Sequence, residues 1–225
     1  MHSYGQQMEE KKNEKNRLLK LIPDTIPRGD AYSVISKLSE VIEIDPNDPT
    51  LYASRANVYI HVNDFDMGFA DYEKAIELDP TNDQIHCKRG LAYFKKASYE
   101  SALKDLNSAI KLNNDNPIYH FFRAEINIKL ENTLTAIKDL NNAIDLDPEF
   151  ADAHLKKAIL CDAIDYKYDA IESYLRYLVY GKDEINIKYV KIRLKELKKT
   201  SKHYKRIYKD SKRKVRNEQK EKKKN

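Results

Sequence analysis

Three histidines, His86, His120 and His154, are spaced 34 residues apart, and histidines at a fixed spacing are candidate metal ligands. Tyr52 holds the same place one period earlier. Equivalent residues of successive helix pairs are separated by at least one interhelical distance, about 8–10 Å. A zinc ion binds nitrogen at about 2.0–2.1 Å, and neither Cys nor a carboxylate shares this phase. We therefore interpret the histidines as packing residues and expect no metal ion and no cofactor.

The same spacing relates a row of basic residues to a row of acidic ones. The basic row is Arg55, Arg89 and Arg123, with Lys157 fourth, and the acidic row sixteen residues later is Asp71, Asp105 and Asp139, with Ser173 fourth. A basic row alone would favour phosphate binding. The matched acidic row favours one Arg–Asp pair per period instead, which would fix the register of two packed helices.

Catalytic motifs are absent from the sequence. It contains no Gly-rich phosphate loop, no GxSxG and no HExxH. Cys87 and Cys161 form no CxxC motif and no metal-ligand spacing, so we interpret them as reduced core thiols. The sequence predicts a protein that is not an enzyme and has no small-molecule substrate.

The elements that carry these residues repeat every 34 residues. Pro46, Pro80 and Pro148 fit one period, with Asn114 in the missing place, and each ends a similar phrase: VIEIDP, AIELDP, AIKLNN and AIDLDP. Gly (5) and Pro (7) are scarce, which favours helices. Each period holds two apolar runs of helical spacing, as in 49–62 and 66–78. Small residues at a fixed phase indicate that the two helices lie close together.

This pattern resembles the tetratricopeptide repeat family. The unit 49–82 carries that family's residues at Tyr52, Ala56, Tyr59, Gly68, Tyr72, Ala75 and Pro80. Units 83–116, 117–150 and 151–182 follow in phase, with departures at Asn114, Asn127 and Tyr177. The resemblance implies an all-α solenoid of helix-turn-helix repeats that acts as a protein-binding scaffold or adaptor.

Other segments flank the four units. Residues 1–29 are polar and expected to be partly disordered, and 30–48 form a degenerate half-repeat. Ile187, Val190, Leu194 and Leu197 make one apolar stripe, which predicts a capping helix over 183–200; a dimerising helix is the alternative. Residues 201–225 form a basic tail.

In tetratricopeptide folds, one face of the first helix of each repeat lines a concave groove. Carried over by phase, the resemblance implies a protein-binding groove that takes a partner peptide or helix. Its residues are Asn57, Ile60, His61, Cys87, Leu91, Phe94, Lys95, Phe121, Glu125, Ile128, Lys129, Leu155, Ile159 and Asp162. The alternative is that these side chains pack on one another or against the terminal helix.

Chaperone-binding members of the family hold a C-terminal carboxylate with a clamp of Lys, Asn and Arg residues. The corresponding positions here are Ala53, Asn57, Lys88, Ile118 and Phe122, and Asn57 alone matches in this frame. Reading a carboxylate needs several converging donors. The sequence therefore disfavours a co-chaperone of this type.

Charge is unevenly distributed along the chain. The net charge is +5, but residues 182–225 hold 19 Lys+Arg against 6 Asp+Glu, which leaves the rest of the chain acidic. Basic tails contact nucleic acid or an acidic partner or serve in nuclear import. The basic residues of the predicted contact are Lys205, Arg206, Lys209, Lys212, Arg213, Lys214 and Arg216. Tyr204 and Tyr208 among them favour stacking on single-stranded RNA; the tail could equally fold back on the acidic body. A role in an RNA- or chromatin-associated complex is thus the alternative function.

The sequence shows no feature of a secreted or membrane protein. Its first residues lack an apolar signal region, and no apolar run approaches the roughly 18 residues of a membrane helix. We expect an intracellular protein, cytoplasmic or nuclear, with no membrane partner.

Overall fold

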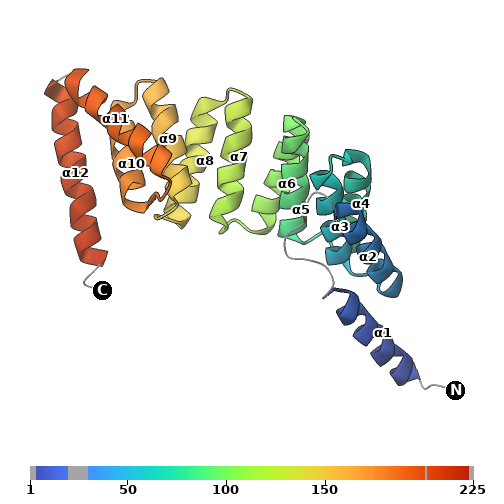
Figure 1. Ribbon diagram of the computed structural model, residues 1–225. Helices are drawn as coiled ribbons and strands as arrows, with labels where there is room; N and C mark the ends of the chain where they lie inside the picture. The colour runs from blue at the N-terminus through green and yellow to red at the C-terminus, as the bar shows by residue number, and fades with distance from the viewer. Residues whose placement is uncertain (1–3, 20–29, 201, 223–225) are drawn as a thin grey trace. The chain divides into compact units, whose positions relative to one another are not determined.

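The computed structural model describes residues 4–19, 30–200 and 202–222, and these ranges contain twelve helices and no strand (Figure 1). The chain divides into an N-terminal unit, Met1–Asn114, and a C-terminal unit, Asp115–Asn225. The N-terminal unit contains α1 (Tyr4–Leu19), α2 (Ala31–Ile44), α3 (Pro49–His61), α4 (Phe65–Leu78), α5 (Asp83–Lys95) and α6 (Tyr99–Leu112). The C-terminal unit contains α7 (Pro117–Lys129), α8 (Thr133–Leu146), α9 (Ala151–Ala163), α10 (Lys167–Tyr180), α11 (Glu184–Thr200) and α12 (Lys202–Lys222).

Each predicted 34-residue unit holds one pair of packed helices. The pairs are α3 with α4, α5 with α6, α7 with α8, and α9 with α10. The first helix of a pair begins after a polar cap: Asp48 accepts from the Thr50 backbone N–H at 2.9 Å, and Asn116 accepts from that of Ile118 at 3.0 Å. In the first and third pairs the second helix ends two residues before the repeated proline, because the helical region is disfavoured for a residue preceding proline, and α6 ends at the same phase before Asn114.

The two helices of a pair approach closely at small residues. Nine alanines at the repeated phases have no exposed surface: Ala56, Ala75, Ala102, Ala109, Ala124, Ala136, Ala143, Ala158 and Ala170. Gly90 takes the place of Ala56 in the next unit, and a methyl group there would lie 2.3 Å from Leu106 Cδ2. The core of each pair is therefore set by short side chains that let two helix backbones pack together.

A left-handed residue ends the first helix of every pair. Asn63, Ala97, Glu131 and Asp165 have φ angles of 66°, 60°, 61° and 65° and are 34 residues apart. In each case the following N–H returns to a carbonyl five residues back, as from Ser98 to Tyr93 at 2.9 Å. The sequence analysis missed this feature because none of the four residues is glycine.

The predicted Arg–Asp pairs are confirmed as bidentate contacts between the helices of a pair. Arg89 Nε and an Nη donate to the two carboxylate oxygens of Asp105, both at 2.7 Å. Arg55 binds Asp71 at 2.8 Å through both oxygens, and Arg123 binds Asp139 at 3.0 and 2.6 Å. Because the carboxylates are buried, these pairs are less screened by solvent than surface ion pairs.

The segment before the repeats contains one helix. Within residues 1–29, Tyr4–Leu19 forms α1, which packs against α2. Lys15 Nζ lies 2.8 Å from both Asp45 and Asp48, at the end of α2 and the start of α3. Pro23 and Pro27, which the sequence pattern marks as helix breakers, lie outside the described residues.

The predicted capping helix is α11. Val190, Leu194 and Leu197 are buried in one apolar cluster with residues of α9 and α10, and Ile187 is half-buried against it. Tyr177, which replaces the usual small residue, is 1% exposed in the same cluster. The larger side chain marks the point where the regular repeat gives way to the terminal hairpin.

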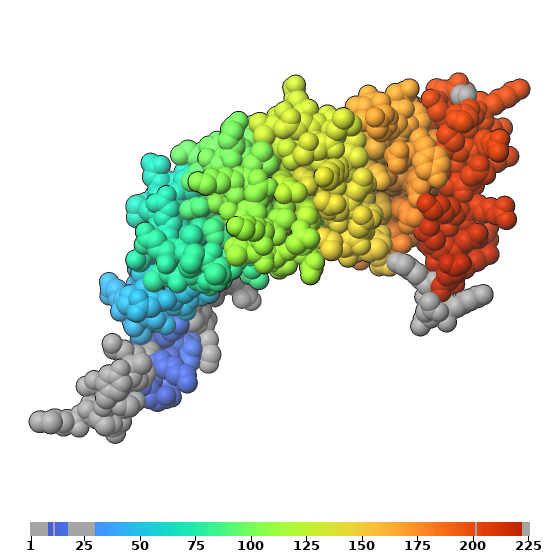
Figure 2. Space-filling model, turned by 180° about the vertical axis from the view of Figure 1, so that it is seen from behind, coloured from blue at the N-terminus to red at the C-terminus, as the bar shows by residue number. Residues whose placement is uncertain are grey.

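The basic tail forms a helix packed on the body of its own unit. α12 packs against the rest of its unit (Figure 2) and contacts both α10 and α11. Val215 and Ser211 are buried at 6% and 2% exposure. Lys214 Nζ lies 2.9 Å from Glu172, and Glu218 lies 2.8 Å from Arg176. Of the alternatives for the tail, the structure thus shows the folded-back arrangement.

Replacing the left-handed Ala97 with glycine is expected to stabilise the fold. A non-glycine residue in the left-handed region destabilises the fold by about 1–2 kcal/mol. Glycine removes that strain, but it loses more chain entropy on folding, which offsets about 0.5–1 kcal/mol of the gain. Ala97→Gly should raise the unfolding free energy by about 0.5–1 kcal/mol in urea denaturation. Ala70→Gly, exposed inside α4, is the matched control and should lower it by about 1 kcal/mol. Equal destabilisation by both substitutions would contradict the strain at Ala97.

Arg89 and Asp105 should be energetically coupled. A double-mutant cycle of Arg89→Ala and Asp105→Ala, followed by urea denaturation, is expected to give a coupling of about 1.5–3 kcal/mol, since both hydrogen bonds involve charged groups. The exposed Lys74–Glu77 pair at 3.2 Å is the control and should give at most about 0.5 kcal/mol. Zero coupling between Arg89 and Asp105 would show that the pair does not fix helix register.

Removing the Glu172 charge should loosen α12. Burial alone would raise the pKa of Glu172, but Lys214 and Arg176 lower it below its usual value. A lowered folded pKa contributes stability above the unfolded value of about 4.3, and that contribution is lost as pH falls through the folded pKa.

Glu172→Gln should therefore cost about 0.5–1.5 kcal/mol at pH 7, and the cost should vanish in acid as the wild-type carboxylate is protonated. Urea denaturation at both pH values measures the cost, and hydrogen exchange at pH 7 should place the loss in α12. Glu221→Gln, at an exposed position of α12, is the control. A pH-independent difference would contradict the ion-pair explanation.

Candidate protein-binding groove surface

The predicted groove residues, which we call the groove surface, lie on the first helix of each pair. Half of them are on α3 and α5 of the N-terminal unit, and half are on α7 and α9 of the C-terminal unit. They differ in exposure. Ile60, Cys87, Leu155 and Asp162 are buried, so these four contribute to the interior rather than to an open surface.

In the N-terminal unit, the buried members serve the core. Ile60 is 8% exposed and packs in a cluster with Tyr72. Cys87 is 6% exposed, and burial raises the pKa of its thiol to about 12, which keeps it protonated and unreactive at neutral pH. Exposed Asn57 accepts a hydrogen bond from the Tyr72 hydroxyl at 2.5 Å, which ties α3 to α4.

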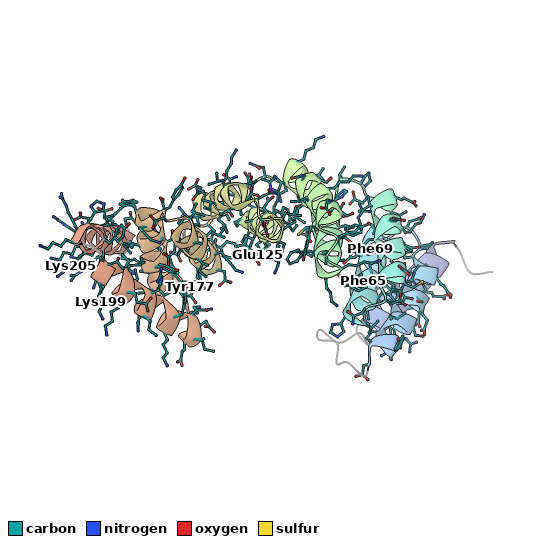
Figure 3. The ribbon with its side chains drawn as sticks, turned by 90° about the horizontal axis from the view of Figure 1, so that it is seen from above. Phe65, Phe69, Glu125, Tyr177, Lys199 and Lys205 are labelled. Atoms are coloured by element: carbon teal, nitrogen blue, oxygen red, sulfur yellow. The ribbon has the colours of Figure 1, made fainter. Side chains whose placement is uncertain are left out.

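Lys95 joins the two helix pairs of the N-terminal unit. Its Nζ donates to the Ile60 carbonyl at 2.5 Å and lies 5.8 Å from the Phe65 ring centroid. Phe65 and Phe69 come from α4 (Figure 3), and Phe69 stacks on Tyr93 of α5 at 4.2 Å. Phe65 and Phe69 carried no functional signal in the sequence. Their role is to bring α4 and α5 together beneath the groove surface.

In the C-terminal unit, apolar and charged members alternate. Half-buried Phe121 lies 4.9 Å from the Phe150 ring, and Ile159 on α9 is 39% exposed. Glu125 on α7 (Figure 3) pairs with Lys156 of α9 at 3.0 Å. This part of the surface therefore combines open apolar side chains with an internally neutralised ion pair.

Asp162 does not belong to an open groove. Its carboxylate accepts from Arg193 of α11 at 2.5 and 3.1 Å and from Lys167 at 2.7 Å. Burial would raise the pKa of Asp162, but these cations lower it below its usual value. Asp162 thus joins the end of α9 to the capping helix α11 in the C-terminal unit.

Side chains at the repeated histidine position contact a backbone carbonyl six residues earlier in the chain, a contact that we call the tether. His86 Nε2 lies 3.1 Å from the Pro80 carbonyl, and His154 Nε2 lies 3.0 Å from that of Pro148. The Tyr52 hydroxyl donates in the same way to Pro46 at 3.1 Å. The separation of six residues from proline to aromatic residue was the available signal for this contact. The tether supports the interpretation of the histidines as packing residues.

The fourth pair lacks the Arg–Asp contact and contains a cavity instead. Lys157 and Ser173 stand in place of the arginine and aspartate, and both line a cavity of about 330 Å³ together with His154 and Arg176. His154 is 1% exposed, and burial lowers its pKa, which favours the neutral ring. The sequence departure at Lys157 and Ser173 therefore coincides with a partly open pocket that Ile144, Asp145 and Pro148 of the preceding unit also line.

The basic residues predicted for the tail are placed on α12 with different surroundings. Lys205, at the end of the unit away from Glu125 (Figure 3), is exposed, as are the other six. Tyr204 and Tyr208 are half-buried against the α9–α11 cluster rather than open for base stacking. Tyr208 is covered by Lys198 Nζ, 4.1 Å from its ring centroid. This arrangement removes the stacking surface that the sequence favoured for single-stranded RNA.

The described part of the chain has neither a metal-binding cluster nor a membrane-spanning helix. Among its residues, no group of three or more His, Cys, Asp and Glu side chains is arranged to hold a metal ion. No helix of that part is long and apolar enough to cross a membrane.

Comparison with known sequences places the repeats in a family. A profile described as "Tetratricopeptide repeat" matches residues 49–82, and one described as "TPR repeat" matches residues 69–97. No curated protein sequence matches the chain.

Solved structures of similar fold agree with these matches. Pseudomonas aeruginosa pilF has a TM-score of 0.72 at 18% identity, over 93% of this chain and 99% of that one. YrrB, a TPR protein with an unusual peptide-binding site, has a TM-score of 0.63 at 18% identity, over 84% and 98%. The first TPR of Spaghetti (RPAP3), bound to the HSP90 peptide SRMEEVD, has a TM-score of 0.51 at 23% identity, over 54% and 96%.

At these identities the structural likeness shows the fold alone, and it confirms the predicted all-α fold class. Together with the profile matches, it identifies the chain as a tetratricopeptide-repeat protein.

Proposed function

We propose that the chain is a non-catalytic scaffold whose groove surface binds an extended or helical peptide of a partner protein. Tetratricopeptide repeats are a protein–protein interaction fold. The observation that supports the proposal is the exposure of apolar side chains on the groove surface. Five apolar side chains of the groove surface keep part of their surface exposed, although two of them, Phe121 and Ile128, also pack against the core of their helix pair. The five are Leu91, Phe94, Phe121, Ile128 and Ile159.

The chemistry of these side chains favours a peptide with apolar anchors. Ile159 is exposed, and Phe121 and Ile128 are half-buried, so a bound side chain would remove apolar surface from water. Glu125, on the same helix as Phe121 and Ile128, is already neutralised by Lys156. We therefore expect binding to depend only weakly on salt, since apolar contacts are not screened by ions.

A C-terminal carboxylate is a poor candidate for this surface. The HSP90 peptide belongs to a neighbour whose likeness to this chain concerns the fold. Four of the five clamp positions here are Ala53, Lys88, Ile118 and Phe122, and the fifth, Asn57, already accepts from Tyr72. The surface lacks the converging donors that carboxylate recognition requires.

The tail adds an electrostatic contact in this proposal. An import signal at Lys212–Arg216 is disfavoured while α12 is docked, because Val215 is buried and Lys214 pairs with Glu172. Nucleic-acid contact is favoured by the other basic residues of α12, which are exposed.

The groove proposal is tested with peptides selected from a random peptide library on the full chain. Ile159→Glu should weaken the binding of such peptides at least about tenfold, which corresponds to about 1.4 kcal/mol. The measurement is a fluorescence anisotropy titration at low and high salt. Leu134→Glu introduces the same charge at a 65%-exposed position of α8, outside the groove surface, and should leave the affinity unchanged.

Two outcomes would overturn the groove proposal: selected peptides that bind both variants equally, or peptides whose affinity collapses in high salt. Circular dichroism and thermal unfolding should show that both variants remain folded. The full chain is used because removing the tail would expose the apolar residues of α10 that Val215 covers.

A further inference from the structure

The outward side of α12 carries a straight row of cations. The row consists of Lys202, Arg206, Lys209, Arg213, Arg216 and Lys220, all exposed. Successive members are four, three, four, three and four residues apart, which keeps them on one face of a helix with 3.6 residues per turn. At about 1.5 Å per residue, the row is about 27 Å long.

The docking of α12 fixes the direction in which this row points. The opposite face carries Ser211, Val215, Tyr204 and Tyr208, which lie buried or half-buried against the body of the unit. Ion pairs from Lys214 to Glu172 and from Glu218 to Arg176 lie together on one flank of that face, since Lys214 and Glu218 are four residues apart. The rotation of α12 is therefore set, and the row faces away from α10.

The row is largely uncompensated by acidic groups. Arg206 Nε lies 3.8 Å from Asp210, and both side chains are exposed, which makes this a weak contact. Within the described residues, that is the row's one ion pair. Lys205 and Lys212 flank one side and widen the cationic face. Such a surface favours a ligand with regularly spaced negative charges.

We propose that α12 binds the phosphate backbone of double-stranded nucleic acid without reading its sequence. A duplex carries one negative charge per about 1.7 Å of its axis, counted over both strands, which makes it a strong electrostatic partner for a rigid cation row about 27 Å long. The row contains lysines and arginines alone, which bind phosphates and set position rather than sequence. This inference rests on the electrostatic role proposed for the tail and does not depend on the groove surface.

Other ligands fit the face less well. A membrane surface would need the apolar side of the helix, which is packed on α10. Single strands would need exposed aromatic rings, and Tyr204 and Tyr208 are turned inward. A peptide with apolar anchors would find no apolar residue in the row.

The test is an anisotropy titration of a labelled 20-base-pair duplex of arbitrary sequence against the full chain, between 50 and 200 mM salt. The slope of log K against log salt is expected to be about −0.9 per phosphate contacted, which is about −5 for the whole row. The variant Arg206→Gln, Lys209→Gln, Arg213→Gln should reduce the magnitude of that slope by about 3 and weaken binding at every sequence tested.

The matched control removes the same charge from the body. Lys104→Gln, Lys111→Gln, Lys138→Gln changes three exposed lysines outside α12 and should leave the slope and affinity within about twofold. Equal loss in both variants would mean that net charge, not the row, attracts the duplex, and would overturn the proposal. Unchanged helicity by circular dichroism excludes unfolding of α12 as the cause.

Two more arms separate the possible ligands and proposals. If polyglutamate binds through the row and the duplex does not, the row serves an acidic protein and the nucleic-acid proposal is wrong. Ile159→Glu should leave duplex binding unchanged. Loss of peptide binding in that variant with intact duplex binding supports both proposals. If the wild type binds no peptide, only the groove proposal is wrong, and if it does not bind the duplex, only the α12 proposal is wrong.

Discussion

The close approach of two helix backbones at buried alanines is the constraint on which the rest of this structure depends. Ala56 and Ala75 in one pair, and Ala124 and Ala143 in another, have no exposed surface, and a larger side chain at these positions would separate the helices. At this separation, the guanidinium of Arg89 reaches both oxygens of Asp105. Packing and pairing thus reinforce one geometry, which then fixes which side chains remain at the surface.

The C-terminal unit shows how a repeat array is closed. Asp162 is held by Arg193 and Lys167, so a position that is Ile60, Phe94 or Ile128 in the inner repeats carries a charge paired with the capping helix here. Tyr177 joins the cluster under α11, and Val215 of α12 completes it. An array needs a polar outer face at its end. Here two helices supply that face, and the second of them is strongly basic.

The consequence is a separation of two surfaces by chemistry. The groove surface offers apolar side chains such as Phe121 and Ile159, while α12 offers cations with no apolar residue among them. Apolar burial and counterion release respond differently to salt. A scaffold with both surfaces can hold a protein by one and an anionic polymer by the other, with affinities that ionic strength adjusts separately.

The sequence by itself determined the repeat. A 34-residue period of small residues, prolines and Arg–Asp pairs is local in the chain, and each pair of helices packs mainly within its own period. The fold class, the helix pairs and the contact between Arg89 and Asp105 were therefore predictable. The left-handed Ala97 was not, because its conformation is fixed by the returning hydrogen bond of Ser98 and not by a residue preference.

Only the tertiary structure decided which of the predicted functional residues are open. The position of a residue along a helix predicts which face its side chain is on, but not whether another helix covers that face. Cys87, Leu155 and Asp162 therefore could not be recognised as buried from the sequence. The same holds for α12. The spacing of Lys and Arg predicts its row of cations, but an isolated basic helix rotates freely. Docking through Val215 and the ion pair with Glu172 is what turns that row outward.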